Sequence, residues 1–419
     1  MSQVKLNLGT EEKQNEIIEI LEEIRNSKDK RYTVRIDKGN SNPSNRITYM
    51  HDAEGMTPAH MNFSTGAFDY GDWKDIWFIK GNYPVMLKYD GTVDYKLNPN
   101  DYTKKEDGTA SDIANTSYGG NAMARFPKVY LSFTEDENYE YISVSDVKYD
   151  RTYEPIGFIN DNGEEVNEIF LAMFDPSNIS SKLRSLSGQT PMTNQTHNNE
   201  VSYARANGTG WYVGTWAQRQ MVNALLIIIS KSDNSQAAFG YGNCDASTYA
   251  KINTGTLNNK GQFFGYSSSD KTKAVKVFHI ENWWGNMYKR IAGLVAYQGK
   301  VYAKMSGPYN TPGETNTSGY TQVLTYDFDM GNGYAVNCKC NNAYGRLPIS
   351  SITPTGGNGS SSTYLCDFFS IDYDENDFYY PIVGSYYGGG EWCGISALFV
   401  SSLASESFPN VATVFSYMP

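Results

Sequence analysis

The stretch Val383–Tyr417, VGSYYGGGEWCGISALFVSSLASESFPNVATVFSY, decides how the rest of the chain is interpreted. Three consecutive glycines follow a tyrosine pair and precede a Glu-Trp pair, and glycine permits the backbone conformations that a tight turn needs. The apolar run at 393–400 is short enough to be a buried strand. A Ser-rich segment then leads to a second strand-like run at 411–415. The pattern predicts an aromatic loop, a buried strand, a second loop and a closing strand.

This layout resembles the end of the C-type-lectin-like fold shared by bacteriophage adhesins, retroelement-diversified variable proteins and formylglycine-generating-type enzymes. In those relatives the chain closes on a strand of the form N-x-G-x-R-x-S-[YF]. Here the strand reads NVATVFSY from Asn410 to Tyr417, with Ala412 in place of Gly and Val414 in place of Arg. The resemblance implies a lectin-like domain at this end of the chain.

Two upstream motifs resemble the formylglycine-generating branch of that fold. The first is RANGTGW, residues 205–211, followed by a helix that Thr215 and Gln218 begin with a capping box and that has a wide apolar face. The second is ENWWGNMY, residues 281–288, in which we expect one of Trp283 and Trp284 in the core and leave the other as a possible surface aromatic. The three motifs occur in the order that the resemblance requires.

The N-terminal residues predict a helix at 10–26 whose apolar residues Ile17, Leu21 and Ile24 have coiled-coil spacing. So short and polar a helix is not stable alone, so it either packs on its own domain or associates with copies of itself. Isoleucine at both kinds of seam position favours self-association as a trimer.

The next block, residues 31–61, contains two alternating strand-like runs around a turn-rich segment. Its R-Y-x-V-R-x-D and D-A-x-G-M patterns resemble a segment of tail-fibre and other structural proteins of bacterial viruses. We therefore expect an α+β chain with three parts: an N-terminal oligomerising or docking helix (1–30), a β-rich linker or attachment segment (31–80), and a C-type-lectin-like binding domain with long loop insertions (81–419).

Charge and hydropathy exclude several classes of function. The formal net charge is -11 at pH 7, and non-specific nucleic-acid binding needs a basic face, so no nucleic-acid partner is expected. The longest apolar run, 224–229, is too short to cross a bilayer, so no membrane insertion is expected. The N-terminus lacks the apolar core of a secretory signal, which indicates a soluble protein made in the cytoplasm.

Catalytic and metal-binding patterns are missing from the sequence. The four histidines are scattered without a nucleophile motif, and the five cysteines lack metal-ligand spacing, so we expect free, mostly buried thiols. Formylglycine-generating relatives use two cysteines near the glycine turn as copper ligands, whereas only Cys393 stands in that window. Asp372–Asp377 has the first ligands of a calcium loop but not the later Gly and Glu, and is expected to be a solvated acidic turn. We expect no cofactor, no metal and no catalytic residue.

Recognition is the function that these patterns favour. Tyr and Trp bury large rigid areas at small entropic cost, so Tyr386, Tyr387, Glu391 and Trp392 are the candidate ligand-binding residues. The resemblances imply a trimeric phage virion protein, made in the host cytoplasm, that contacts other virion proteins and binds a host-surface glycan or protein without catalysis. Two alternatives stay open: a capsid-attached head fibre or decoration protein with a lectin-like tip, and an enzyme of the polysaccharide depolymerase or oxidase-like kind.

Overall fold

The computed structural model describes residues 29–419 except 246, 249, 310–315, 326–331, 354 and 372–376. The expected oligomerisation residues Ile17, Leu21 and Ile24, and all of the expected acidic turn 372–377 except Asp377, lie outside the described residues. The described part is rich in β-strands and contains few helices, which confirms the expectation of a β-rich chain. The C-type-lectin-like assignment stays a prediction.

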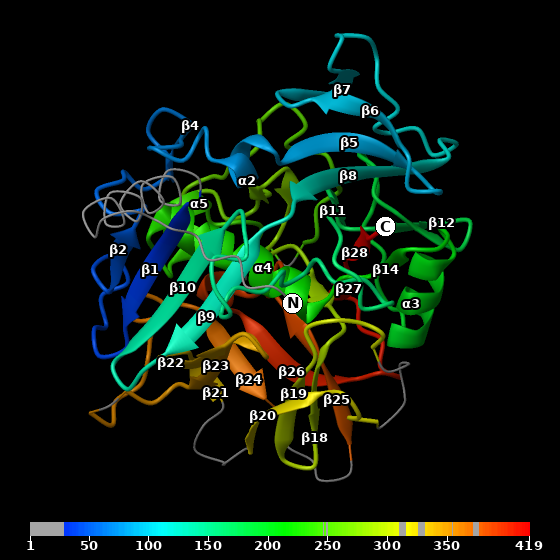
Figure 1. Cartoon of the computed structure of the whole chain (residues 1–419). Coiled ribbons are helices and arrows are strands. Elements are labelled where there is room, and N and C mark those ends of the chain that lie inside the picture. Colours follow the sequence, from blue (N-terminus) through cyan, green and yellow to red (C-terminus); the bar gives the residue numbers. More distant parts are fainter. Residues whose placement is uncertain are drawn as a thin grey trace, which may run out of the picture.

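The first large sheet is antiparallel and contains four strands in the order β2-β1-β10-β9 (Figure 1). Its strands are β1 (Arg31–Asp37), β2 (Ile47–His51), β9 (Tyr130–Glu135) and β10 (Tyr139–Ser145). Tyr32, Val34 and Ile36 alternate along β1 and are buried, as a two-residue period requires. The hairpin expected within 31–61 is therefore confirmed for β1 and β2.

The second sheet contains seven strands in the order β14-β28-β11-β8-β5-β6-β7. Its strands are β5 (Tyr83–Lys88), β6 (Val93–Asn98), β7 (Asp101–Lys105), β8 (Gly120–Pro127), β11 (Glu168–Ala172), β14 (Trp211–Val213) and β28 (Phe415–Tyr417). The last strand of the chain, β28, lies between β11 and β14 and thus closes this sheet with residues from three distant segments.

The third sheet contains nine strands: seven in the order β20-β19-β18-β25-β26-β24-β21, and β17 and β27 beside them, with β17 paired to both β25 and β27. Its strands are β17 (Tyr288–Arg290), β18 (Leu294–Tyr297), β19 (Lys300–Ala303), β20 (Thr321–Thr325), β21 (Asn332–Tyr334), β24 (Phe368–Ile371), β25 (Phe378–Val383), β26 (Leu398–Leu403) and β27 (Val411–Thr413). The closing strand-like run 411–415 is confirmed as β27 and the start of β28. The expected buried strand at 393–400 begins only at Leu398, and 393–397 form a loop.

Four hairpins and a few short helices complete the described part. The hairpins are β3 (His60–Asn62) with β4 (Ala67–Asp69), β12 (Ser177–Ile179) with β13 (Lys182–Arg184), β15 (Lys276–Val277) with β16 (Ile280–Glu281), and β22 (Asn337–Asn341) with β23 (Gly345–Ser350). The helices are α2 (Trp77–Lys80), α3 (His197–Arg205), α4 (Trp216–Ser230), α5 (Ser235–Phe239) and the 3-10 turn η1 (Gly390–Trp392).

Helix α4 lies at the centre of the molecule and contacts β1, β10, β23 and α5 (Figure 1). The predicted capping box is confirmed: the Gln218 amide donates to Thr215 Oγ1 over 3.3 Å, and the Thr215 amide donates to Gln218 Oε1 over 3.2 Å. All 15 residues of α4 are buried, not only its apolar face. Helices that are buried all round are typical of the interior of a large protein.

Residues 31–80 pack into the same core as α4 and do not form a separate linker. Trp73 and Phe78 are fully buried in that core, and the Tyr49 hydroxyl donates to the Ile228 carbonyl oxygen of α4 over 2.8 Å. The expected linker is corrected for this reason: the apolar face of β1 needs a partner, and α4 supplies it.

Trp283 and Trp284 are both buried, at 6% and 0% exposure, so a surface position for one of them is wrong. The Trp283 indole donates to Asn223 Oδ1 over 2.9 Å, and the Trp284 indole donates to the Tyr241 carbonyl oxygen over 3.2 Å. Buried indoles with hydrogen-bond partners are stable core residues. The second family-like motif is therefore structural.

Candidate binding surface

The structure brings all four predicted ligand-binding residues together in one turn between β25 and β26. Trp392 is 40% exposed, Glu391 is exposed, and Tyr386 and Tyr387 are half-buried. Gly390 adopts a φ of 56°, in the left-handed region that favours glycine, and its amide donates to the Cys244 carbonyl oxygen over 2.7 Å. The prediction of an exposed aromatic loop at the three glycines is thus confirmed for this turn.

A continuous series of stacked and edge-on ring contacts extends from this turn into the protein. We call Tyr288, Phe368, Tyr386, Tyr387, Trp392 and Phe399 the aromatic surface. Trp392 stacks on Phe368 with ring centroids 4.5 Å apart, and Phe368 stacks on Phe399 at 5.8 Å.

The series continues beyond Phe399. The ring centroid of Tyr288 lies 5.1 Å from that of Phe399 and, in a stacked pair, 4.8 Å from that of Tyr386. The centroids of Tyr386 and Tyr387 are 5.2 Å apart. Tyr288 and Phe399 are buried, so the exposed rings stand on a buried aromatic base. Stacked pairs of this kind add stability beyond their buried area, which makes the rings rigid contacts.

Buried side chains hold the loop after the turn in place. Asn223 Nδ2 of α4 donates to the Ile395 carbonyl oxygen over 2.7 Å, and Asp367 Oδ2 accepts from the Ser396 amide over 2.7 Å. Arg219 Nη2, also on α4, donates to the Ile395 carbonyl oxygen over 3.3 Å. Because α4 is central and fully buried, these bonds fix the turn to the most protected element of the fold.

A polar loop borders the aromatic surface. Glu391 Oε2 accepts from Ser361 Oγ over 2.8 Å, so the Ser-rich segment at 352–363 meets the glycine turn. Both residues lie at the surface, where their polar atoms can also contact a ligand. An apolar centre with a polar rim is the usual anatomy of a recognition surface.

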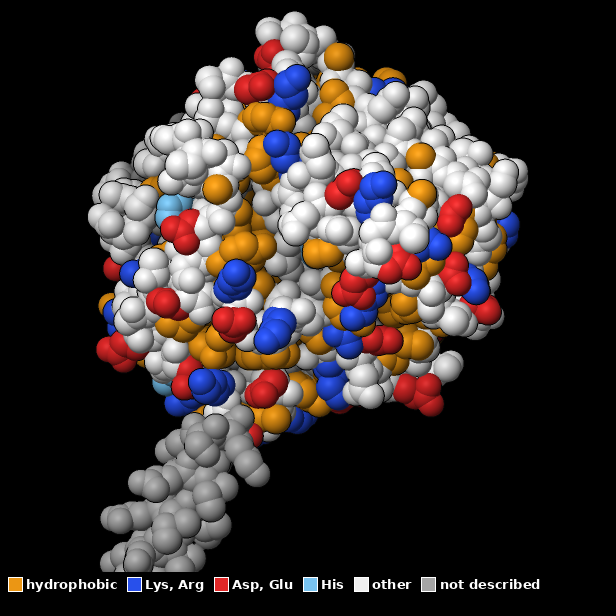
Figure 2. All heavy atoms as spheres, turned by 90° about the horizontal axis from the view of Figure 1, so that it is seen from above, with side chains coloured by type: hydrophobic (Ala, Val, Ile, Leu, Met, Phe, Trp, Pro, Cys, Tyr) orange, Lys and Arg blue, Asp and Glu red, His pale blue; other side chains and the backbone are white. Residues whose placement is uncertain are grey.

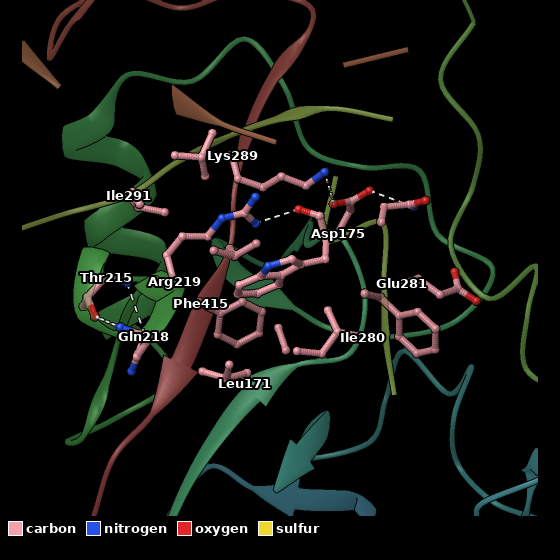
Figure 3. Close-up of a pocket in the computed structure, with 17 residues that line it drawn as sticks. Leu171, Asp175, Thr215, Gln218, Arg219, Ile280, Glu281, Lys289, Ile291 and Phe415 are labelled. Carbon is pink, nitrogen blue, oxygen red and sulfur yellow. Dashed lines mark hydrogen bonds and ion pairs between the residues drawn. The ribbon is translucent and has the colours of Figure 1, made fainter. Parts of the chain in front are cut away.

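Three charged groups with perturbed pKa values lie around a buried pocket beside α4. Figure 3 shows Arg219, Lys289 and Asp175 around this pocket. Burial raises the pKa of Asp175 and lowers the pKa of Lys289, and it lowers the pKa of Arg219 to about 9. The pocket has a volume of only about 20 Å³, room for roughly one water molecule. Perturbed groups often mark active sites, but this pocket cannot admit a substrate.

The cysteines are free and buried in all five cases, which confirms the sequence prediction. The fold nevertheless brings the Cys244 thiol within hydrogen-bonding range of Cys393, a neighbour that the sequence analysis missed. Both residues are 0% exposed, and burial raises the pKa of Cys244 well above its usual range.

Other classes of site find little support in the described part of the chain. Among the residues described, no group of three or more His, Cys, Asp and Glu side chains is arranged to hold a metal ion. No described helix is long and apolar enough to cross a membrane. On the face shown in Figure 2, Lys and Arg side chains alternate with Asp and Glu side chains, so this face has no continuous basic patch.

Sequence reasoning missed Tyr288, Phe368 and Phe399, because these rings join the turn from three other strands, β17, β24 and β26. One local signal existed for Phe368: it alternates with the buried Phe369 in β24, so the two rings point to opposite faces.

Comparisons with known proteins add little to what this geometry shows. No protein-family model matches the chain, and no curated protein matches it. A solved structure named Major Tropism Determinant U1 Variant is similar over 80% of this chain and 72% of that chain, with 9% sequence identity and a TM-score of 0.27. A likeness at this level is too weak to assign a fold or a function.

Proposed function

We propose that this chain is a receptor-binding protein of a bacterial virus, which recognises a glycan or a protein on the host surface through the aromatic surface and without catalysis. The observation that carries the proposal is the exposed Trp392 stacked on Phe368, at the end of a ring series whose base is buried. Large exposed aromatics on a rigid base are the residues that dominate recognition surfaces.

Low ordering cost and a large apolar area favour binding through the aromatic surface. Ring contacts already order Trp392 and its neighbours, so the entropic cost of immobilising them on binding is small. Their rings offer apolar faces for a sugar ring or an apolar side chain, and Glu391 and Ser361 offer hydrogen-bonding groups at the edge.

The viral assignment rests on the resemblance of residues 31–61 to segments of phage structural proteins. We propose that residues 1–30 form the oligomerising or docking helix, with Ile17, Leu21 and Ile24 in the contact between three copies. Three copies would strengthen a weak single-site interaction by avidity. Attachment to other virion proteins, at the tail or at the capsid, fits either form of the proposal.

Whole-cell binding tests the proposal. Fluorescently labelled protein is added to a panel of bacterial strains, and bound protein is measured by flow cytometry for the wild type and for Trp392→Ala. Phe63→Ala is the matched control, because Phe63 is an exposed aromatic of similar exposure, 38%, outside the aromatic surface. We expect binding to a positive strain to weaken at least about tenfold in Trp392→Ala and to stay unchanged in Phe63→Ala.

Equal binding by the wild type and by a Tyr386→Ala/Trp392→Ala double variant refutes the aromatic surface as the contact. Treatment of the cells with periodate, which destroys sugar diols, or with a protease then separates a glycan receptor from a protein receptor. Release of reducing sugar ends during incubation would instead indicate a depolymerase and refute the non-catalytic function.

A further inference from the structure

A large cleft in the described part of the chain lies away from the aromatic surface and shares no residue with it. It has a volume of about 1000 Å³, at the upper end of the range of roughly 300 to 1000 Å³ for ligand sites. Its walls come from the β5–β6 turn, the 159–162 turn, the segment from the end of α3 to β14, residues 307–309, and 416–419. The RANGTGW motif, residues 205–211, therefore borders the cleft.

Hydrogen bonds between distant segments tie the walls of the cleft to each other. The Trp211 indole donates to the Tyr89 carbonyl oxygen over 2.8 Å, and the Met418 amide donates to the Gly210 carbonyl oxygen over 3.0 Å. On the floor, Gln218 Nε2 donates to Ser416 Oγ over 3.0 Å. These bonds hold the walls in place without a ligand, so the entropic cost of ordering the cleft on binding is small.

Glycines allow the close approach of these walls. Gly210 has a φ of 81°, and a Cβ there would lie 2.6 Å from the Met418 carbonyl oxygen and 2.8 Å from the Tyr417 ring. A Cβ at Gly307 would lie 1.9 Å from Asp161 Oδ1. A side chain at either position would displace a wall, so the glycines of this region serve the shape of the cleft.

The lining combines aromatic rings with hydrogen-bonding groups. Tyr212 stacks on Tyr309 with centroids 6.0 Å apart, and the Arg205 guanidinium lies 5.0 Å from the centroid of Tyr212. The exposed polar side chains along the cleft are Asp90, Asp161, Asn162, Arg205 and Thr209.

This chemistry selects among ligand classes. Two carboxylates against one guanidinium disfavour an anionic polymer such as a nucleic acid. The density of polar groups disfavours an apolar ligand, which would leave them without partners. Rings interleaved with carboxylate, amide and hydroxyl groups match a ligand that has apolar ring faces and many hydroxyl groups.

We propose that this cleft is a second binding site, which takes a segment of a neutral or amino-sugar oligosaccharide. Arg205, Asp161 and Thr209 contact sugar hydroxyl or amino groups, and Tyr309 and Tyr417 contact ring faces and edges. The site is independent of the aromatic surface, so each can fail without the other.

An array of immobilised neutral, amino and acidic oligosaccharides, probed with the full chain, tests this proposal. Isothermal titration with the free form of the strongest neutral or amino oligosaccharide then compares the wild type with Thr209→Trp, which fills the cleft from an exposed position, and with Asp161→Asn. Glu137→Gln, an exposed carboxylate in the β9–β10 turn, is the control for Asp161→Asn.

We expect at least about tenfold weaker binding in Thr209→Trp and in Asp161→Asn, with Glu137→Gln unchanged. The proposal is overturned if the wild type binds no neutral or amino oligosaccharide, or if Trp392→Ala abolishes binding while Thr209→Trp leaves it intact. The last result would place the sugar on the aromatic surface and support the proposed function alone. A negative array would also refute the cleft site. If whole-cell binding were then lost in Trp392→Ala and kept in Thr209→Trp, the function proposed for the aromatic surface would still stand.

Discussion

Removal of one carboxylate from a buried cluster of four charges should destabilise the protein severely. The cluster contains Arg46, Glu140, Asp233 and Arg346, with side chains at most 5% exposed. Arg346 Nη1 lies 2.7 Å from Asp233 Oδ1, its Nε lies 2.5 Å from Glu140 Oε2, and Arg46 Nη1 lies 3.5 Å from Asp233 Oδ2. Two cations and two anions balance, and the Asp233 and Glu140 charges raise the pKa of Arg346 although burial opposes them.

Asp233→Asn keeps the shape of the side chain but removes its negative charge. One buried positive charge is then left without compensation. Breaking a buried pair in this way costs about 3 to 5 kcal/mol. The Arg46 guanidinium is the most affected, because neither of its Nη atoms has a hydrogen bond in the described structure. Urea unfolding of wild type and variant, followed by tryptophan fluorescence and far-UV circular dichroism, measures the loss of unfolding free energy.

Two further variants make the test sharp. Glu135→Gln breaks the Lys38–Glu135 pair, whose side chains are 15% and 21% exposed, and should cost less than about 1 kcal/mol. The double variant Arg46→Met/Asp233→Asn restores neutrality around Arg346 and Glu140, so it should be more stable than Asp233→Asn alone. The reasoning fails if Asp233→Asn costs no more than Glu135→Gln, or if the double variant loses the sum of both single losses.

Three other predictions concern the glycines, a buried histidine and the thiols. Gly163→Ala and Gly210→Ala both force a side chain into positive φ, at about 1 to 2 kcal/mol each. Only Gly210→Ala also meets close atoms, so its unfolding free energy should fall by about 1 to 3 kcal/mol more than that of Gly163→Ala, and equal losses would refute the close approach. Burial, with the nearby Lys276 charge, holds the pKa of His279 well below its usual value, so below pH 6.5 the unfolded state takes up a proton that the folded state does not. Stability therefore falls as pH falls, and between pH 7.5 and 5.0 the wild type should lose about 2 kcal/mol more than His279→Asn; parallel pH profiles would contradict this. The five buried thiols should react with a thiol reagent only slowly in the native protein and completely after denaturation, whereas rapid native reaction of any one would contradict their burial.

The sequence predicted local structure where the signal was local. The capping box at Thr215 and Gln218 located the start of α4, and the alternation in 31–37 located β1. Both patterns depend on residues within a few positions of each other.

Interactions between distant segments could not be read in the same way. Residues 31–80 looked like a linker because their partners, α4 and β10, lie far along the chain. The polar residues Arg219 and Asn223 are buried because carbonyl oxygens from the 393–397 loop accept their hydrogen bonds. Local periodicity contains no information on such partners.

The sequence predicted the residues of the candidate site that lie in the glycine turn, but not the rings on which they pack. Trp392 and Tyr386 follow from a glycine turn with aromatic neighbours, whereas Phe368 and Tyr288 join the site only through folding. The same limit applies to Cys244, which the sequence separates widely from Cys393 and which the fold places beside it.

The accessibility of Trp392 in the bound protein tests the central claim most directly. Hydroxyl-radical footprinting compares the oxidation of side chains in free protein with that in protein bound to cells of a positive strain. The aromatic surface predicts that Trp392 oxidises several-fold more slowly when the protein is bound, while Phe63 oxidises at the same rate in both states. An unchanged rate at Trp392 in a sample shown to be bound would contradict the claim.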